Sequence, residues 1–169
     1  FKEIDNIVLV VGKTEGHIDQ SLFARNILDK KNGPPPQINL FNEKNNGETL
    51  LKLIDSGYIK SAHDVSVGGI ITAVSKMCIK GNKGVNLKKP KYLMNEIEYF
   101  FAEDQGRYII EVNKEGLKKV TDILDKNAVH YDELGTINED QLFINEKTKV
   151  TIDELRTSNT NWLTNYMSK

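Results

Sequence analysis

The order of its apolar segments constrains the fold of this chain most. Short runs rich in β-branched residues predict strands, and segments whose apolar residues recur every three to four positions predict helices. The two kinds do not alternate strictly, so the order indicates an α+β fold of packed layers rather than a doubly wound parallel sheet. We expect strands over residues 6–12, 59–65, 84–87, 106–112, 130–137 and 141–145.

The predicted helices carry recognisable start signals. Asp19 is placed to cap the first, and Thr151 with Glu154 three residues later forms a potential capping box for the last. Residues 94–105 are ambiguous and read as a short helix that runs into a loop. The predicted helices cover residues 19–28, 39–55, 68–81, 113–127 and 151–169.

Two connections between these elements have clear local chemistry. The stretch "NGPPP" at residues 32–36 predicts a rigid extended connector, because proline lacks the backbone donor of a helix or central strand. The stretch "NED" at residues 138–140 lies between the last two predicted strands, and we interpret it as a hairpin turn that joins them.

Composition limits the class of protein and its partners. A length of 169 residues suits one domain, residues 1–169, with a sizeable core. The net charge of -1 argues against a nucleic-acid partner, and no apolar run approaches the roughly 20 residues that span a bilayer, which argues against a membrane partner. The first residue is Phe1 rather than Met, so we expect a piece of a longer protein.

The single cysteine, Cys78, excludes a disulfide within the chain and a zinc site built from several thiolates. Its position among the apolar residues of a predicted helix indicates core packing. The absence of disulfides fits a cytoplasmic protein.

The stretch "VGKTEG", residues 11–16, is typical of a phosphate-binding loop only in part. That loop also needs a glycine five positions before the Gly-Lys pair, where this chain has Ile7. We therefore predict a turn at the end of a strand.

The stretch "AHDVSVGG", residues 62–69, is the first candidate site. Its strand ends near His63 and Asp64, and Gly68 and Gly69 open a helix whose free amides suit a phosphate group. Asp64 offers a carboxylate that could hold Mg²⁺. The alternative is that Asp64 or Ser66 caps the helix and that the glycines permit a tight turn.

The stretch "AEDQGRY", residues 102–108, is the second candidate. Polar residues held at a strand end can read a substrate, which makes Glu103, Gln105 and Arg107 binding candidates. Alternatively, Arg107 pairs with a nearby acid and holds the loop.

Together these stretches resemble the phosphoribosylformylglycinamidine synthase family. The resemblance is carried by "SAHDVSVGGIITAVSKMCIKGNKGVNL" and "FFAEDQGRYIIEV", by the opening "NIVLVVGKTEGHIDQSLFARNIL", and by "GPPPQINLFNEKNNGETLLKLIDSGYIKSAHDVS". It implies the C-terminal domain of the second half of a synthetase in the aminoimidazole ribonucleotide synthetase superfamily, with a mixed sheet packed against helices.

The resemblance also implies an activity for the full-length enzyme. ATP, with Mg²⁺, activates the amide oxygen of formylglycinamide ribonucleotide, and glutamine-derived ammonia displaces the phosphate. The implied partners are the remaining domains of the same synthetase, a glutaminase subunit or domain, and a small accessory subunit. The catalytic histidines belong to other domains, so the isolated domain is expected to be inactive.

The family's site residues carry over by position. In the first half of the enzyme, the position of Asp64 helps to bind magnesium and the positions of Glu103 to Gln105 contact substrate. Two residues depart from that pattern: Val67 replaces an acid, and Asp104 stands where a small hydroxyl residue is usual.

Two other readings remain open. The chain could be a non-catalytic module that binds a nucleotide or a partner through the same helix start. It could also belong to another enzyme of the superfamily, such as a selenophosphate synthetase, a thiamine-phosphate kinase or a hydrogenase maturation protein.

Overall fold

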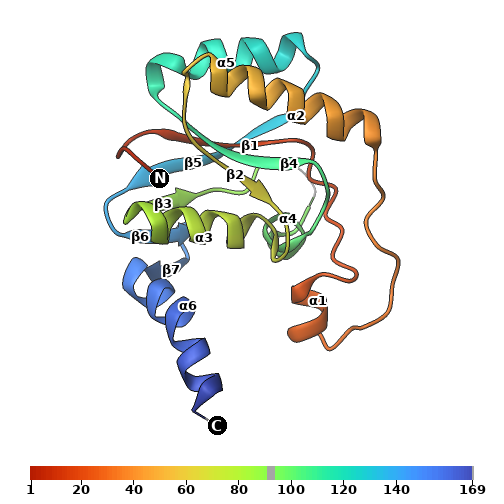
Figure 1. Ribbon diagram of the computed structural model, residues 1–169, viewed down its shortest axis with the longest axis vertical. Coiled ribbons are helices and arrows are strands. Elements are labelled where there is room, and N and C mark those ends of the chain that lie inside the picture. Colours follow the sequence, from red (N-terminus) through yellow and green to blue (C-terminus); the bar gives the residue numbers. More distant parts are fainter. Residues whose placement is uncertain (91–93, 169) are drawn as a thin grey trace.

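A seven-stranded mixed sheet forms the centre of the computed structural model, which describes residues 1–90 and 94–168 (Figure 1). The strand order is β2-β4-β1-β5-β3-β6-β7. Strands β3 and β6 run parallel, and the other neighbouring pairs run antiparallel. The strands are β1 Ile7–Val11, β2 Ile59–Val65, β3 Gly84–Leu87, β4 Arg107–Val112, β5 Tyr131–Asn138, β6 Gln141–Ile144 and β7 Thr148–Thr151.

Helices cover both faces of this sheet, as the α+β prediction requires (Figure 1). Helices α3 and α4 pack on one face and α2 and α5 on the other, while α1 lies beside α4. Among the described residues, no helix has the length and apolar character needed to cross a bilayer. The helices are α1 Leu22–Asn26, α2 Leu40–Asp55, α3 Gly69–Gly81, α4 Glu96–Phe101, α5 Lys114–Lys126 and α6 Ile152–Met167.

Strand β1 separates two hydrophobic cores, which explains its unbroken apolar sequence. Val8 and Val10 face the core that contains α3, whereas Leu9 and Val11 face the core beneath α2 and α5. A strand that is buried on both faces has no solvent side and therefore needs no polar alternation. Cys78 on α3 is fully buried in the first core, so the prediction of core packing is confirmed.

The predicted hairpin between β5 and β6 is wrong, because β3 lies between these strands and pairs with both. Residues 138–140 nevertheless reverse the direction of the chain, because β5 and β6 run in opposite directions on either side of β3. Gly84 makes the insertion possible: a side chain there would collide with Asn138 and with the backbone of Gln141. Strand β7, which was not predicted from the sequence, is the antiparallel partner of β6.

Helix α1 is shorter than predicted and its cap is a different residue. Gln20 has a φ of 64°, a left-handed conformation that excludes it from a right-handed helix. The helix therefore begins after Ser21, whose side chain accepts a hydrogen bond from the backbone N–H of Ala24 at 3.0 Å, and Asp19 does not cap it. Asp29, with a φ of 50°, lies just beyond the end of the segment.

Other predicted boundaries are confirmed. Helix α2 begins at the predicted place, with Asn39 as its cap, and residues 94–105 do form a short helix that runs into a loop. Helix α6 has the predicted capping box, in which Thr151 and Glu154 exchange side-chain and backbone hydrogen bonds.

Candidate functional site

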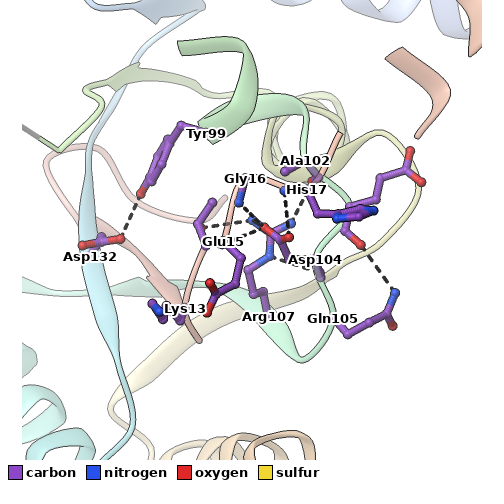
Figure 2. Close-up of polar contacts among 12 residues, drawn as sticks. Lys13, Glu15, Gly16, His17, Tyr99, Ala102, Asp104, Gln105, Arg107 and Asp132 are labelled. Atoms are coloured by element: carbon purple, nitrogen blue, oxygen red, sulfur yellow. Dashed lines mark hydrogen bonds and ion pairs between the residues drawn. The ribbon is translucent and has the colours of Figure 1, made fainter. Parts of the chain in front are cut away.

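Asp104 organises the loop between α4 and β4 by accepting hydrogen bonds from another segment. Its carboxylate receives the backbone N–H groups of Glu15, Gly16 and His17 at 2.9, 3.0 and 3.0 Å (Figure 2). A carboxylate that accepts three backbone donors fixes the path of the chain that supplies them. Asp104 therefore joins the segment after β1 to the "AEDQG" loop.

Arg107 lies beneath this loop and is 1% exposed. Its Nε donates to the carbonyl of Asp104, and its two terminal nitrogens donate to Thr14 Oγ1 at 3.1 Å and to the carbonyl of Ala102 at 2.7 Å (Figure 2). Burial lowers the pKa of Arg107, and the negative charge of Asp104 opposes that shift. This geometry favours the interpretation in which Arg107 holds the loop, because the guanidinium reaches no surface where a ligand could meet it.

Glu103 connects the two candidate stretches. Its Oε1 accepts the backbone N–H of Gly68, at the start of α3, and that of Leu22, at the start of α1, both at 2.8 Å. The predicted capping by Asp64 or Ser66 is wrong: the cap position of α3 is Gly68, whose conformation is left-handed with a φ of 86°. The carboxylate that satisfies this helix start thus comes from a distant part of the sequence.

Gly69 explains the second glycine of the pair. It has a φ of 70°, and a side chain there would lie 2.6 Å from the carbonyl oxygen of Ala102 and 2.7 Å from that of Phe100. The backbone of α3 can approach the end of α4 this closely because Gly69 has no Cβ. Gly68 therefore permits the turn before α3, and Gly69 permits the close packing of α3 against the end of α4.

Asp64 and His63 lie on β2, the edge strand, where Asp64 pairs with Tyr108 at the start of β4. The Asp64 side chain is 68% exposed, and His63 Nδ1 lies 3.3 Å from Asp64 Oδ1. Among the described residues, no three His, Cys, Asp or Glu side chains are close enough together to hold a metal ion. Mg²⁺ is usually held by one or two carboxylates together with phosphate oxygens and water, so Asp64 supplies one ligand of such a site and not a complete one. Ser66 is exposed in the turn that follows.

A pocket of about 920 Å³ opens beside the Asp104 loop. The proline connector and the start of α2 form one wall, and Lys13, His17 and Gln105 line the other side. Of the predicted site residues, Gln105 is the one that lines this pocket; Glu103 and Arg107 support the loop behind it.

Several pocket residues were not predicted. Asn46 donates to the carbonyl of Gly106 at 2.9 Å, and His17 Nε2 lies 2.8 Å from the carbonyl of Pro34, which closes the connector over the pocket. Lys13 belongs to the Gly-Lys-Thr turn, whose sequence does not match a phosphate-binding loop. Its side chain lines the pocket. Its partner Glu15 lies 2.8 Å away. The pocket therefore offers amide groups to a small polar molecule, whereas the charge of Lys13 is paired with Glu15 and the acids Glu43 and Asp104 also line the wall.

Comparison with known proteins places this arrangement in a family. Residues 3–145 match the model of "AIR synthase related protein, C-terminal domain". The chain is 71% identical over 167 residues to the phosphoribosylformylglycinamidine synthase subunit PurL of Pelagibacter ubique, and 35% identical over 165 residues to the subunit of that name from Bartonella quintana. The two matches cover 99% and 98% of this chain, but only 23% and 22% of the relatives' own length.

The fold has a solved counterpart. A structure of Thermotoga maritima PurL complexed with FGAR superposes with a TM-score of 0.74 at 19% identity, over 91% of this chain and 28% of that one. The mixed sheet and its helical layers are therefore shared with that protein. On the extent of the family match, the chain belongs to the AIR synthase related proteins and corresponds to their C-terminal domain.

Proposed function

We propose that residues 1–169 are the C-terminal domain of the second half of a phosphoribosylformylglycinamidine synthase. The observation that carries this proposal is the 71% identity to the Pelagibacter ubique subunit over nearly the whole chain. The chain spans about a quarter of that relative's length, so the activity belongs to a longer polypeptide.

In the proposed reaction, ATP transfers its terminal phosphoryl group to the amide oxygen of formylglycinamide ribonucleotide. Ammonia then attacks the resulting imidate carbon, and phosphate leaves with the oxygen. The products are formylglycinamidine ribonucleotide, ADP and phosphate. We propose that Mg²⁺ accompanies ATP and that Asp64, as a single exposed carboxylate, is the one residue of the two candidate stretches that would supply it with a ligand.

The contribution of this domain is a binding wall rather than reacting groups. Asp104, Glu103 and Arg107 are engaged by protein atoms and hold the loop in shape. Gln105 and Lys13 line the pocket, and we propose that Lys13 exchanges its partner Glu15 for a phosphate-bearing ligand such as ATP or the ribonucleotide. His63, Asp64, Ser66, Gly68 and Gly69 remain proposed contacts of the assembled enzyme.

The same pocket favours the second candidate, a module that binds a nucleotide without taking part in catalysis. Equilibrium binding of ATP to the isolated chain distinguishes the two. Micromolar affinity that Gln105→Ala weakens about tenfold supports the module, provided that the control Glu48→Gln, at an exposed position of α2, leaves it unchanged. Binding that requires the full-length polypeptide supports the enzyme domain.

The proposed partners follow from the same family. They are the remaining domains of the polypeptide, a glutaminase that supplies ammonia, and a small accessory subunit. A solved structure of PurLQS from Thermotoga maritima contains this fold, and the curated relatives are named as subunits, which supports an assembly of several subunits. We propose a cytoplasmic location, which the lone buried thiol, Cys78, supports.

The decisive assay uses the full-length polypeptide with ammonium chloride as the nitrogen source. We expect ADP to form only when formylglycinamide ribonucleotide is present, with one formylglycinamidine ribonucleotide per ADP. The isolated 169-residue chain serves as the control and should give no product. ATP hydrolysis that is indifferent to this ribonucleotide would sink the proposal.

A further inference from the structure

Helix α6 leaves the body of the protein soon after it begins (Figure 1). Ile152 is its buried residue, and Leu155 packs against the edge of the α3 core. From residue 157 to residue 168 every described position is exposed. About three turns of this helix therefore have no packing against the rest of the described chain.

The exposed turns carry an apolar stripe. Trp162, Leu163, Tyr166 and Met167 are 61%, 52%, 68% and 74% exposed, and a helical rotation of about 100° per residue places them on one side. The rings of Trp162 and Tyr166 lie 6.3 Å apart between centroids. Residues 157–168 contain no charged side chain, although 28% of the whole chain is charged. An uncharged aromatic face of this kind is typical of the core of an interface.

The sequence of these turns does not stabilise a helix by itself. Residues 157–161 read "TSNTN", and Thr, Ser and Asn are weak helix formers because their side chains compete for backbone hydrogen bonds. Isolated helices of this length are marginal in water even with better sequences. Burial of the apolar stripe against another surface would therefore add the stability that the sequence of these turns lacks.

We infer that the face formed by Trp162, Leu163, Tyr166 and Met167 docks into an apolar, uncharged groove on another domain of the same full-length polypeptide. This inference rests on the proposed function to the extent that both require a longer chain. Helix α6 lies beyond the family match at residues 3–145, yet the Pelagibacter ubique relative aligns over 99% of this chain and extends far outside it. That additional length supplies the partner domain.

The size of the stripe favours a tethered domain over a second copy of the chain. Four large apolar side chains at roughly 150 Å² each bury about 600 Å². A stable dimer needs about 800 Å² per partner. A domain on the same polypeptide docks with less area, because covalent linkage raises its effective concentration to the millimolar range.

Hydrogen exchange of the full-length polypeptide tests this inference. We expect the amides of residues 157–168 to be protected on the order of 100-fold relative to an unstructured peptide. The double variant Trp162→Ser and Tyr166→Ser should remove most of that protection, and the amides of β1 should report that the domain remains folded. Serine matches tryptophan and tyrosine in helix propensity, so the variant changes burial rather than helix preference.

Asn161→Ser is the matched control, because residue 161 lies on the opposite side of the helix from the stripe. In this variant the amides of residues 157–168 should be protected as strongly as in the unchanged protein. Exchange of residues 157–168 at the unstructured rate in the full-length polypeptide overturns the inference. Protection that rises with protein concentration also overturns it, in favour of a second copy. The readout is independent of catalysis, so protection in a polypeptide without synthase activity would refute the proposed function alone.

Discussion

Asp104 and Arg107 form an ion pair in the interior, with Arg107 Nη1 3.7 Å from Asp104 Oδ2 and side chains that are 0% and 6% exposed for Arg107 and Asp104. The pair joins the end of α4, the start of β4 and the segment after β1. Each charge is additionally hydrogen-bonded, Asp104 by three backbone N–H groups and Arg107 by Thr14 and two carbonyls. The wall of the pocket is therefore positioned from behind by a fully engaged polar cluster.

Asp104→Ala should destabilise the protein strongly. The substitution leaves the buried Arg107 charge without its counter-charge and leaves the N–H groups of Glu15, Gly16 and His17 without their acceptor. Removing one partner of a buried pair costs about 3–5 kcal/mol of unfolding free energy. Urea unfolding measures the effect. The matched control is Asp122→Ala, which breaks an exposed pair with Lys118 and should cost less than about 1 kcal/mol. Equal losses in the two variants would contradict this account.

Glu103 should stabilise the fold through one oxygen, Oε1, which accepts two backbone N–H groups. Glu103→Ala removes the acceptor of the Gly68 and Leu22 amides, and we expect a loss of about 1–2 kcal/mol in unfolding free energy. Glu103→Gln keeps an oxygen at that position and should recover more than half of the loss. If glutamine proved as damaging as alanine, charge rather than hydrogen bonding would be responsible.

Gly84→Ala tests the position of β3 between β5 and β6. The added methyl group meets Asn138 and the backbone of Gln141, so we expect about 1–3 kcal/mol of destabilisation from overpacking. Gly47→Ala is the counterpart: it lies inside α2, where the nearest atom to a new Cβ is the Tyr108 hydroxyl at 3.5 Å. That change should stabilise by about 0.5–1 kcal/mol. A simple β5–β6 hairpin would tolerate alanine at residue 84.

Cys78 should be chemically silent in the native protein. Burial raises the pKa of its thiol to about 12, against a small opposite effect of the N-terminal ammonium group. Because the pKa is raised, the thiol stays protonated at about pH 8 and the reactive thiolate is on the order of one part in 10⁴. A disulfide reagent should therefore label Cys78 rapidly only after unfolding in guanidinium. Fast labelling of the native protein would show that α3 opens.

The sequence predicts elements of this fold better than it predicts their pairing. Strand β1 follows from an unbroken β-branched run and helix α3 from apolar periodicity, and both are local properties of the sequence. The insertion of β3 between β5 and β6 depends on contacts between residues far apart in the chain, such as Asn86 with Asn138, and no local pattern encodes them. The start of α1 depends on the backbone conformation of Gln20, a residue type that usually avoids positive φ.

The candidate site shows the same division. Gln105 was predicted because polar residues at a strand end are often placed to bind a ligand, but the pocket it lines also requires the proline connector from far earlier in the chain. Glu103 was predicted to meet a ligand, and the structure shows that it caps a helix start 35 residues away. Spacing along the chain could identify the residue but not its hydrogen-bond partner.

Growth without purines tests whether the full-length polypeptide is a phosphoribosylformylglycinamidine synthase that needs this domain. A bacterial strain that lacks phosphoribosylformylglycinamidine synthase is supplied with the gene for the full-length polypeptide or with the same gene lacking residues 1–169. We predict that only the full-length gene restores growth, and that added purine rescues both strains equally. Failure of a well-expressed, folded full-length polypeptide to restore growth, or full restoration without residues 1–169, would contradict it.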